Sequence, residues 1–94
     1  MLHVMALIRF QEQHAEAVCA AMAELAVNSR KEPGCLRYEV FRRAGEATLM
    51  TQETWADTAA EQAHMKGANL AATVAKIGTL LAAAPEIHHY SQIA

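Results

Sequence analysis

Five residues with chemically useful side chains fall on two neighbouring predicted strands and the helix that follows them: Tyr38, Thr51, Glu53, Trp55 and His64. Residues two apart on a strand share a face, so Thr51, Glu53 and Trp55 point the same way. Polar groups that converge on an apolar floor are typical of a small-molecule binding site. The sequence therefore predicts a candidate pocket between this face of the sheet and the helix that carries His64.

Three of these residues also have purely structural explanations, which the sequence leaves open. Trp55 is large and apolar enough to be only a core residue, and His64 on an apolar helix stripe can be a hydrogen-bonded core histidine. Tyr38 either lines the pocket or fills the core with its hydroxyl at the rim of the sheet. The stripe around His64 is rich in alanine and glycine, so it either leaves a cavity or lets the backbones approach closely.

Glu53 likewise has structural alternatives to a catalytic role. Its carboxylate can cap the next helix or form an ion pair with Arg37 or Arg42. If the carboxyl is instead buried without a partner, it holds its proton more tightly and can act as a base. The surroundings of Glu53 therefore decide whether it is a candidate for proton transfer.

Neither the histidines nor the cysteines predict a metal site. His88 and His89 are adjacent, and adjacent residues of a strand point to opposite faces, so the two cannot easily bind one ion. No third ligand has a suitable spacing. Cys19 and Cys35 have neither metal-binding nor disulfide spacing, and we expect them to be reduced and buried.

Hydrophobic periodicity predicts four strands and three helices. In chain order they are a strand at 2–10, a helix at 13–30, strands at 35–43 and 46–55, a short helix at about 58–67, a helix at about 69–83 and a strand at 86–93. The expected inward stripes are Ala15, Val18, Met22, Leu25, Ala26 and Ser29 on the first helix, Ala60, Ala63, His64 and Gly67 on the second, and Leu70, Val74, Ile77 and Leu81 on the third.

A tight turn at Ala44-Gly45 would set the register of the two central strands. Paired residue numbers then sum to 89, so Tyr38 lies opposite Thr51 and Leu36 shares its face. On the first strand Leu2, Val4, Ala6, Ile8 and Phe10 alternate with a second, partly apolar face.

The order β-α-β-β-α-β, with the second helix broken in two, is that of a ferredoxin-like α+β fold with an antiparallel sheet. One domain is expected to span residues 1–94. Helices would cover one face of the sheet and leave the other open. Because that open face is mixed rather than polar, we expect a homodimer formed through it.

Composition and charge narrow the classes of partner. Hydrophobic residues make up 53% of the 94 residues, but many are alanines, so the core should be modest. The net charge of -2 and the lack of a basic cluster argue against nucleic acid. No apolar run approaches the roughly 20 residues that span a membrane, and the N-terminus lacks the features of a secretion signal. We therefore expect a cytoplasmic protein.

The chain resembles the antibiotic biosynthesis monooxygenase family of small dimeric α+β barrels over nearly its whole length. The resemblance is carried by "NSRKEPGCLRYEVF" at 28–41, by "ETW" at 53–55 before a helix, and by His64 nine residues after Trp55. One departure is Asn69, at a position where many relatives have a second histidine.

This resemblance implies a cofactor-independent oxygenation of a phenol, quinol or anthrone by O2, with no metal, flavin or haem. Trp55 would then line the pocket, and His64 or Glu53 would assist proton transfer. Tyr38 or Asn28 would hydrogen-bond substrate oxygens, and Thr51 would belong to the same substrate site.

Two rival functions share the fold. One is a non-catalytic ligand-binding or stress protein. The other is an isomerase of a phosphorylated signalling sugar related to autoinducer-2, for which Arg30, Arg37 or Arg42 would have to bind phosphate. A haem-degrading branch of the superfamily is set aside, because no asparagine precedes residue 28 and no histidine lies between 65 and 87.

Overall fold

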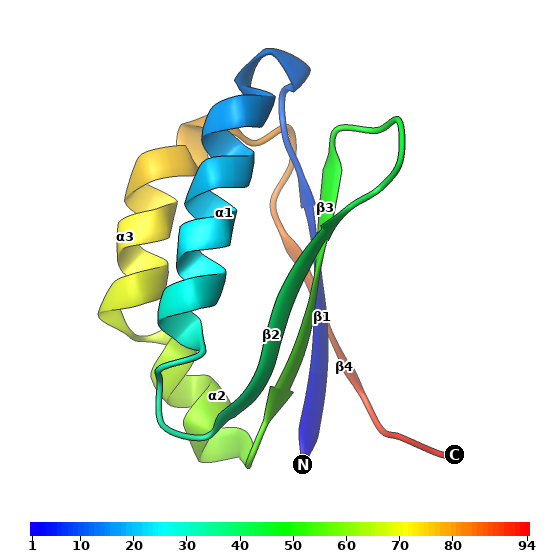
Figure 1. Cartoon of the computed structure of the whole chain (residues 1–94), viewed down its shortest axis with the longest axis vertical. Helices are drawn as coiled ribbons and strands as arrows, with labels where there is room; N and C mark the ends of the chain where they lie inside the picture. The colour runs from blue at the N-terminus through cyan, green and yellow to red at the C-terminus, as the bar shows by residue number, and fades with distance from the viewer.

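The computed structural model describes residues 1–94 and contains one four-stranded sheet with helices packed on one of its faces (Figure 1). Its elements are β1 Leu2–Arg9, η1 Glu12–His14, α1 Ala15–Ser29, β2 Cys35–Arg42, β3 Thr48–Trp55, α2 Thr58–Met65, α3 Ala68–Ile77, η2 Gly78–Leu80 and β4 Glu86–Tyr90. The strands are antiparallel in the order β2-β3-β1-β4. The predicted ferredoxin-like α+β fold is therefore confirmed, and no helix is long and apolar enough to cross a bilayer.

The core lies between the sheet and the helices α1 and α3, which run side by side (Figure 1). Alternation on β1 buries Val4, Ala6 and Ile8, as its period of two predicts. The stripe on α1 is also confirmed, because Val18, Met22, Leu25, Ala26 and Ser29 are all buried and Ala15 packs against them at the start of the helix. No helix covers the opposite face of the sheet, which is open in the monomer.

The predicted register of β2 against β3 is wrong by two residues. Tyr38 pairs with Glu53 and Val40 with Thr51, so the paired numbers sum to 91. The cause is a longer loop, in which the Arg43 amide donates to the Thr48 carbonyl across four intervening residues. A shift of two keeps the side chains of the regular part of the pairing on their predicted faces, so Tyr38, Thr51 and Glu53 still share one face.

A β-bulge between Cys35 and Arg37 overturns the prediction for Leu36. The extra residue in the bulge is Leu36, which is 57% exposed instead of facing the core with Tyr38. Cys35 packs against the core in its place. Both cysteines are free and half-buried rather than fully buried, and burial together with the Glu32 carboxylate raises the pKa of the Cys35 thiol.

The stripes on α2 and α3 are partly wrong. Glu61 is buried together with His64 on α2, whereas Ala63 is exposed. On α3 Thr73 takes the inward place expected for Val74, and its hydroxyl is satisfied by donating to the Asn69 carbonyl at 3.1 Å. The helix ends at 77 rather than 83, and β4 ends at 90 rather than 93.

The turn before β2 makes a very close contact with α2 at Gly34. Gly34 has φ +81°, and a Cβ built there would lie 2.5 Å from the Ala60 Cβ. The Gly34 carbonyl also accepts a hydrogen bond from the Ala56 amide at 2.8 Å. Only glycine suits both the positive φ and the lack of space, so this residue fixes where α2 begins relative to the turn.

Replacing Gly34 with Ala should therefore destabilise the fold for two reasons. The positive φ costs about 1–2 kcal/mol and the clash with Ala60 about 1–3 kcal/mol more. Gly45→Ala is the matched control, since Gly45 has φ +76° but nothing within 4 Å of its Cβ position. Urea denaturation should show the larger loss for Gly34→Ala, and equal losses would contradict the close packing.

Candidate functional site

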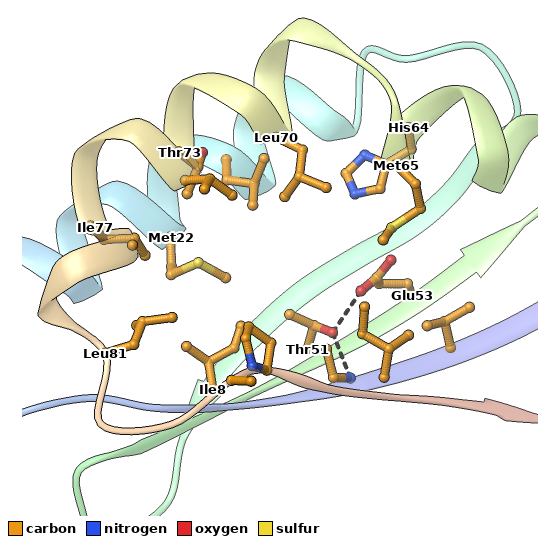
Figure 2. Close-up of a pocket in the computed structure, with 18 of the residues that line it drawn as sticks. Ile8, Met22, Thr51, Glu53, His64, Met65, Leu70, Thr73, Ile77 and Leu81 are labelled. Carbon is orange, nitrogen blue, oxygen red and sulfur yellow. Dashed lines mark hydrogen bonds between the residues drawn. The ribbon is translucent and has the colours of Figure 1, made fainter.

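A cavity of about 540 Å³ lies between the sheet and the helices, mainly lined by hydrophobic side chains (Figure 2). Its size falls within the range of small-molecule sites. Ile8, Met22, Ile77 and Leu81 are gathered in one half (Figure 2). Exposed Met65, Val74 and Ile87 and the segment 82–85 also line it, so the cavity opens between α3 and the approach to β4.

Most polar groups of the cavity lie at the end near α2, and the exception is Thr73 on α3, whose hydroxyl donates to the Asn69 carbonyl. Thr51 and Glu53 point into it from β3, and His64 points in from the opposite side (Figure 2). Tyr38 also lines the cavity, so four of the six predicted site residues share one space. No lysine or arginine lines it. The site therefore has an apolar body and a single polar end without a cation.

Glu53 is buried, and no cation accompanies it. Its carboxylate accepts hydrogen bonds from the Thr51 hydroxyl at 2.7 Å and from Trp55 Nε1 at 3.0 Å. Thr51 in turn accepts from the Ala6 amide at 3.0 Å. Because its proton is committed to Glu53, Thr51 orients that carboxylate. The alternative roles of Glu53 are excluded, since Asp57 caps α2, and the predicted arginine partners pair elsewhere.

His64 is held by a carboxylate from the turn after α1. Its Nδ1 lies 2.7 Å from Glu32 Oε1, and only 2% of its side chain is exposed. Asn69 Nδ2 donates to the other oxygen of Glu32 at 2.8 Å. Ser29 Oγ is the one side-chain polar atom that is completely inaccessible and also lacks a hydrogen-bond partner, so His64 Nε2 is not completely inaccessible. His64 Nε2, which has no protein partner, is therefore open to the cavity.

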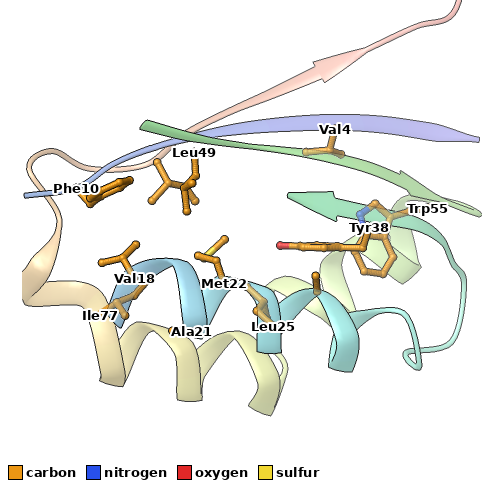
Figure 3. Packing of buried hydrophobic residues seen from close by; sticks show 12 residues of the cluster. Val4, Phe10, Val18, Ala21, Met22, Leu25, Tyr38, Leu49, Trp55 and Ile77 are labelled. Atoms are coloured by element: carbon orange, nitrogen blue, oxygen red, sulfur yellow. The ribbon is translucent and has the colours of Figure 1, made fainter. Parts of the chain in front are cut away.

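The structure places Trp55 behind the cavity rather than in its wall, which corrects the expected lining role. Trp55 is fully buried, and its ring lies 4.7 Å from that of His64 at 34°. It meets Tyr38 edge-on at the end of the core cluster (Figure 3). Trp55 thus affects the site by holding Glu53 and by packing against His64.

Tyr38 extends between the sheet and α1, with its oxygen directed towards Met22 (Figure 3). Its hydroxyl has no protein partner and is not sealed, so it is available to a ligand in the cavity. Burial raises the pKa of the Tyr38 phenol, and the carboxylates of Glu53 and Glu32 raise it further. The phenol therefore stays protonated and acts as a hydrogen-bond donor.

Asn28 does not line the cavity, contrary to its expected place in the substrate site. It lies near the end of α1, where its backbone carbonyl accepts a hydrogen bond from Asn69 at 3.5 Å. The three arginines considered as phosphate ligands do not line the cavity either. Arg30 donates to the Tyr38 carbonyl, Arg37 pairs with Glu39, and Arg42 pairs with Glu12, all outside the cavity.

Sequence reasoning missed Glu32 and Glu61 as partners of histidines, and Asn69 as a partner of Glu32. Asn69 stood out only as a departure from the family pattern, and Glu32 only as part of the turn. Glu61 is buried on α2 and bonds His89 Nε2 at 2.8 Å. Its position three residues before His64 was the one available signal, because that spacing shares a helix face.

The comparisons with known proteins identify the family and agree with the fold. The family model described as antibiotic biosynthesis monooxygenase matches residues 1–76. A Bacillus subtilis (strain 168) protein named "Putative monooxygenase YcnE" is 32% identical over 84 residues, 88% of each chain. A crystal structure of an antibiotic biosynthesis monooxygenase superposes with a TM-score of 0.93 at 23% identity, covering 100% of both chains. A Pseudomonas aeruginosa protein superposes with a TM-score of 0.91 at 26% identity, covering 99% of this chain and 94% of its own. The chain therefore belongs to the antibiotic biosynthesis monooxygenase family.

Proposed function

We propose that the protein is a monooxygenase that oxidises a small electron-rich phenol, quinol or anthrone with O2, without a bound cofactor. The observation that carries the proposal is a mainly apolar cavity that has Glu53 and His64 at one end and the Tyr38 hydroxyl directed from there towards the apolar body. Family membership and the monooxygenase name of the Bacillus relative support the reaction class.

In the proposed reaction the substrate hydroxyl, or the enol form of an anthrone, gives its proton to His64 Nε2. The resulting oxyanion accepts a hydrogen bond from the Tyr38 phenol, which burial keeps protonated. The substrate anion then passes an electron to O2, and the two radicals combine to a peroxide anion at carbon. Protonated His64 returns its proton to this anion and gives a hydroperoxide. For an anthrone, loss of water leaves a carbonyl, so one oxygen atom enters the product and the other leaves as water. The four electrons come from the substrate.

The apolar lining favours this chemistry because a bound substrate would displace water, which would otherwise compete for the anion and the peroxide. Glu53 is the alternative base, but both of its oxygens already accept hydrogen bonds. The sugar-phosphate isomerase is not proposed, because no arginine or lysine lines the cavity to bind phosphate. We expect the reaction to take place in the cytoplasm.

Protein freed of metal and flavin should consume a matching quinol or anthrone with one O2 per substrate, above the uncatalysed rate. An oxygen electrode and product analysis measure both quantities. A panel of quinols and anthrones should be tested. If these compounds bind but none causes O2 uptake above the uncatalysed rate, the proposed oxygenase activity is wrong and a ligand-binding protein of the same fold is favoured.

His64→Ala should lower kcat/KM at least tenfold, because a positioned general base typically contributes about 10²–10⁴-fold. His88→Ala is the matched control, since His88 lies on β4, pairs with Glu86 and does not line the cavity. Near-UV circular dichroism checks that both variants keep the fold. Equal rates for the two variants would remove His64 from the mechanism.

We also propose that two copies associate through the open face of the sheet. Phe41 and Tyr90 are 45% and 48% exposed there, and Met5, Leu7 and Met50 are only half-buried beside them. A contiguous exposed apolar patch of this kind is typical of a protein–protein interface, and association of two copies would bury it.

At micromolar concentration, light scattering after size-exclusion chromatography should give twice 10.2 kDa. Leu7→Lys, near the middle of this face, should yield a monomer, because each interface would then bury two unpaired charges. Ala20→Lys on the exposed side of α1 is the control and should remain dimeric. A monomeric wild-type protein would contradict the proposed dimer.

A further inference from the structure

The contact between Glu32 and His64 shows which of the two side chains donates the hydrogen bond. Glu32 stands between two side chains, with Oε1 2.7 Å from His64 Nδ1 and Oε2 2.8 Å from Asn69 Nδ2. An ionised carboxylate can only accept hydrogen bonds. Both neighbours must therefore donate to it, and His64 Nδ1 carries a proton.

The orientation of the Asn69 amide is fixed independently. Its nitrogen also faces the Asn28 carbonyl at 3.5 Å, so the NH₂ group, not the oxygen, points towards Glu32. Trp55 and Tyr38 restrict the His64 ring, with centroids 4.7 and 5.5 Å away. These rings limit rotation but do not distinguish the two nitrogens, and Glu32 is the group that does.

We propose that Glu32 and Asn69 are positioning residues that hold neutral His64 in its Nδ1–H tautomer. Its Nε2 lone pair then faces the cavity and accepts the substrate proton (Figure 2). The role in turnover rests on the proposed function, whereas the tautomer is a property of the folded chain. Asn69, which departs from the common family pattern, thereby supports the site through a carboxylate.

The chain contains an internal reference for this assignment. His89 contacts the buried Glu61 through Nε2, at 2.8 and 3.0 Å from the two carboxylate oxygens. The same argument gives His89 the opposite, Nε2–H tautomer. One spectrum should therefore contain two carboxylate-bound histidines with opposite tautomers.

The test is long-range ¹H–¹⁵N correlation NMR of the histidine rings above neutral pH, with assignments from His64→Ala and His89→Ala. Wild-type His64 should show a protonated Nδ1 and an unprotonated Nε2. Glu32→Gln should reverse this pattern. The side-chain amide introduced there must offer its oxygen to Asn69, which leaves its NH₂ group facing His64 Nδ1 and forces that nitrogen to accept.

The double variant Glu32→Gln/Asn69→Asp should restore the Nδ1–H tautomer. The carboxylate introduced at position 69 accepts from the NH₂ group introduced at position 32, which frees the amide oxygen at position 32 for His64. Glu24→Gln is the matched control, because Glu24 is an exposed residue of α1 that pairs with Lys76 of α3. This variant should leave the tautomers of both histidines unchanged. kcat should fall at least tenfold in Glu32→Gln, with KM nearly constant, and recover in the double variant.

An Nε2–H tautomer in wild-type His64 would overturn the proposal even if Glu32→Gln and the double variant failed to fold. An unchanged tautomer in folded Glu32→Gln would overturn it as well. The proposed oxygenase fails separately: if no substrate is consumed but the tautomer reverses and is restored as expected, the positioning by Glu32 and Asn69 stands.

Discussion

The close approach of Gly34 to Ala60 is the constraint on which the site depends. Because no side chain separates the turn after α1 from α2, the turn and the helix are held together at one end of the sheet. Glu32 lies in that turn and His64 one helical turn after Ala60, so the same contact brings the carboxylate to the imidazole. Farther along, the cavity lies between α3, the sheet and the segment that leads to β4. The small residues of α2 therefore allow close packing at one place, and a space remains beside it.

The site combines buried acidic groups with few compensating charges. Glu53 is stabilised by a hydroxyl and an indole N–H, and Glu32 by an imidazole and an amide. Hydrogen bonds to a charged group contribute about 1.5–3 kcal/mol each, enough to hold a carboxylate without a nearby arginine. The negative charges also favour a protonated Tyr38. The polar end thus contains both a fixed donor and a fixed acceptor.

Patterns with a regular period could be predicted from the sequence, and contacts between distant side chains could not. Alternation placed Tyr38, Thr51 and Glu53 on one face even though the register was off by two, because an even shift preserves the faces. The bulge that exposes Leu36 interrupts that period and has no signal in a single sequence. The partnership of Glu32 with His64 spans 32 residues and depends on side-chain rotamers. The same holds for Trp55, whose inward direction was predictable but whose place behind His64 was not.

The segment before β4 forms part of the mouth of the cavity and lies apart from its polar groups. Backbone hydrogen bonds tie it to the end of β1, from the Gln11 amide to the Leu80 carbonyl and from the Ala82 amide to the Arg9 carbonyl. Between that anchor and Pro85 it presents three successive alanines, all exposed and all lining the cavity. Larger side chains at these positions would reshape the mouth while β3 and α2 kept the polar end unchanged. The shape of the opening can therefore vary at little cost in stability, because substitutions at exposed positions usually change stability by less than about 0.5 kcal/mol.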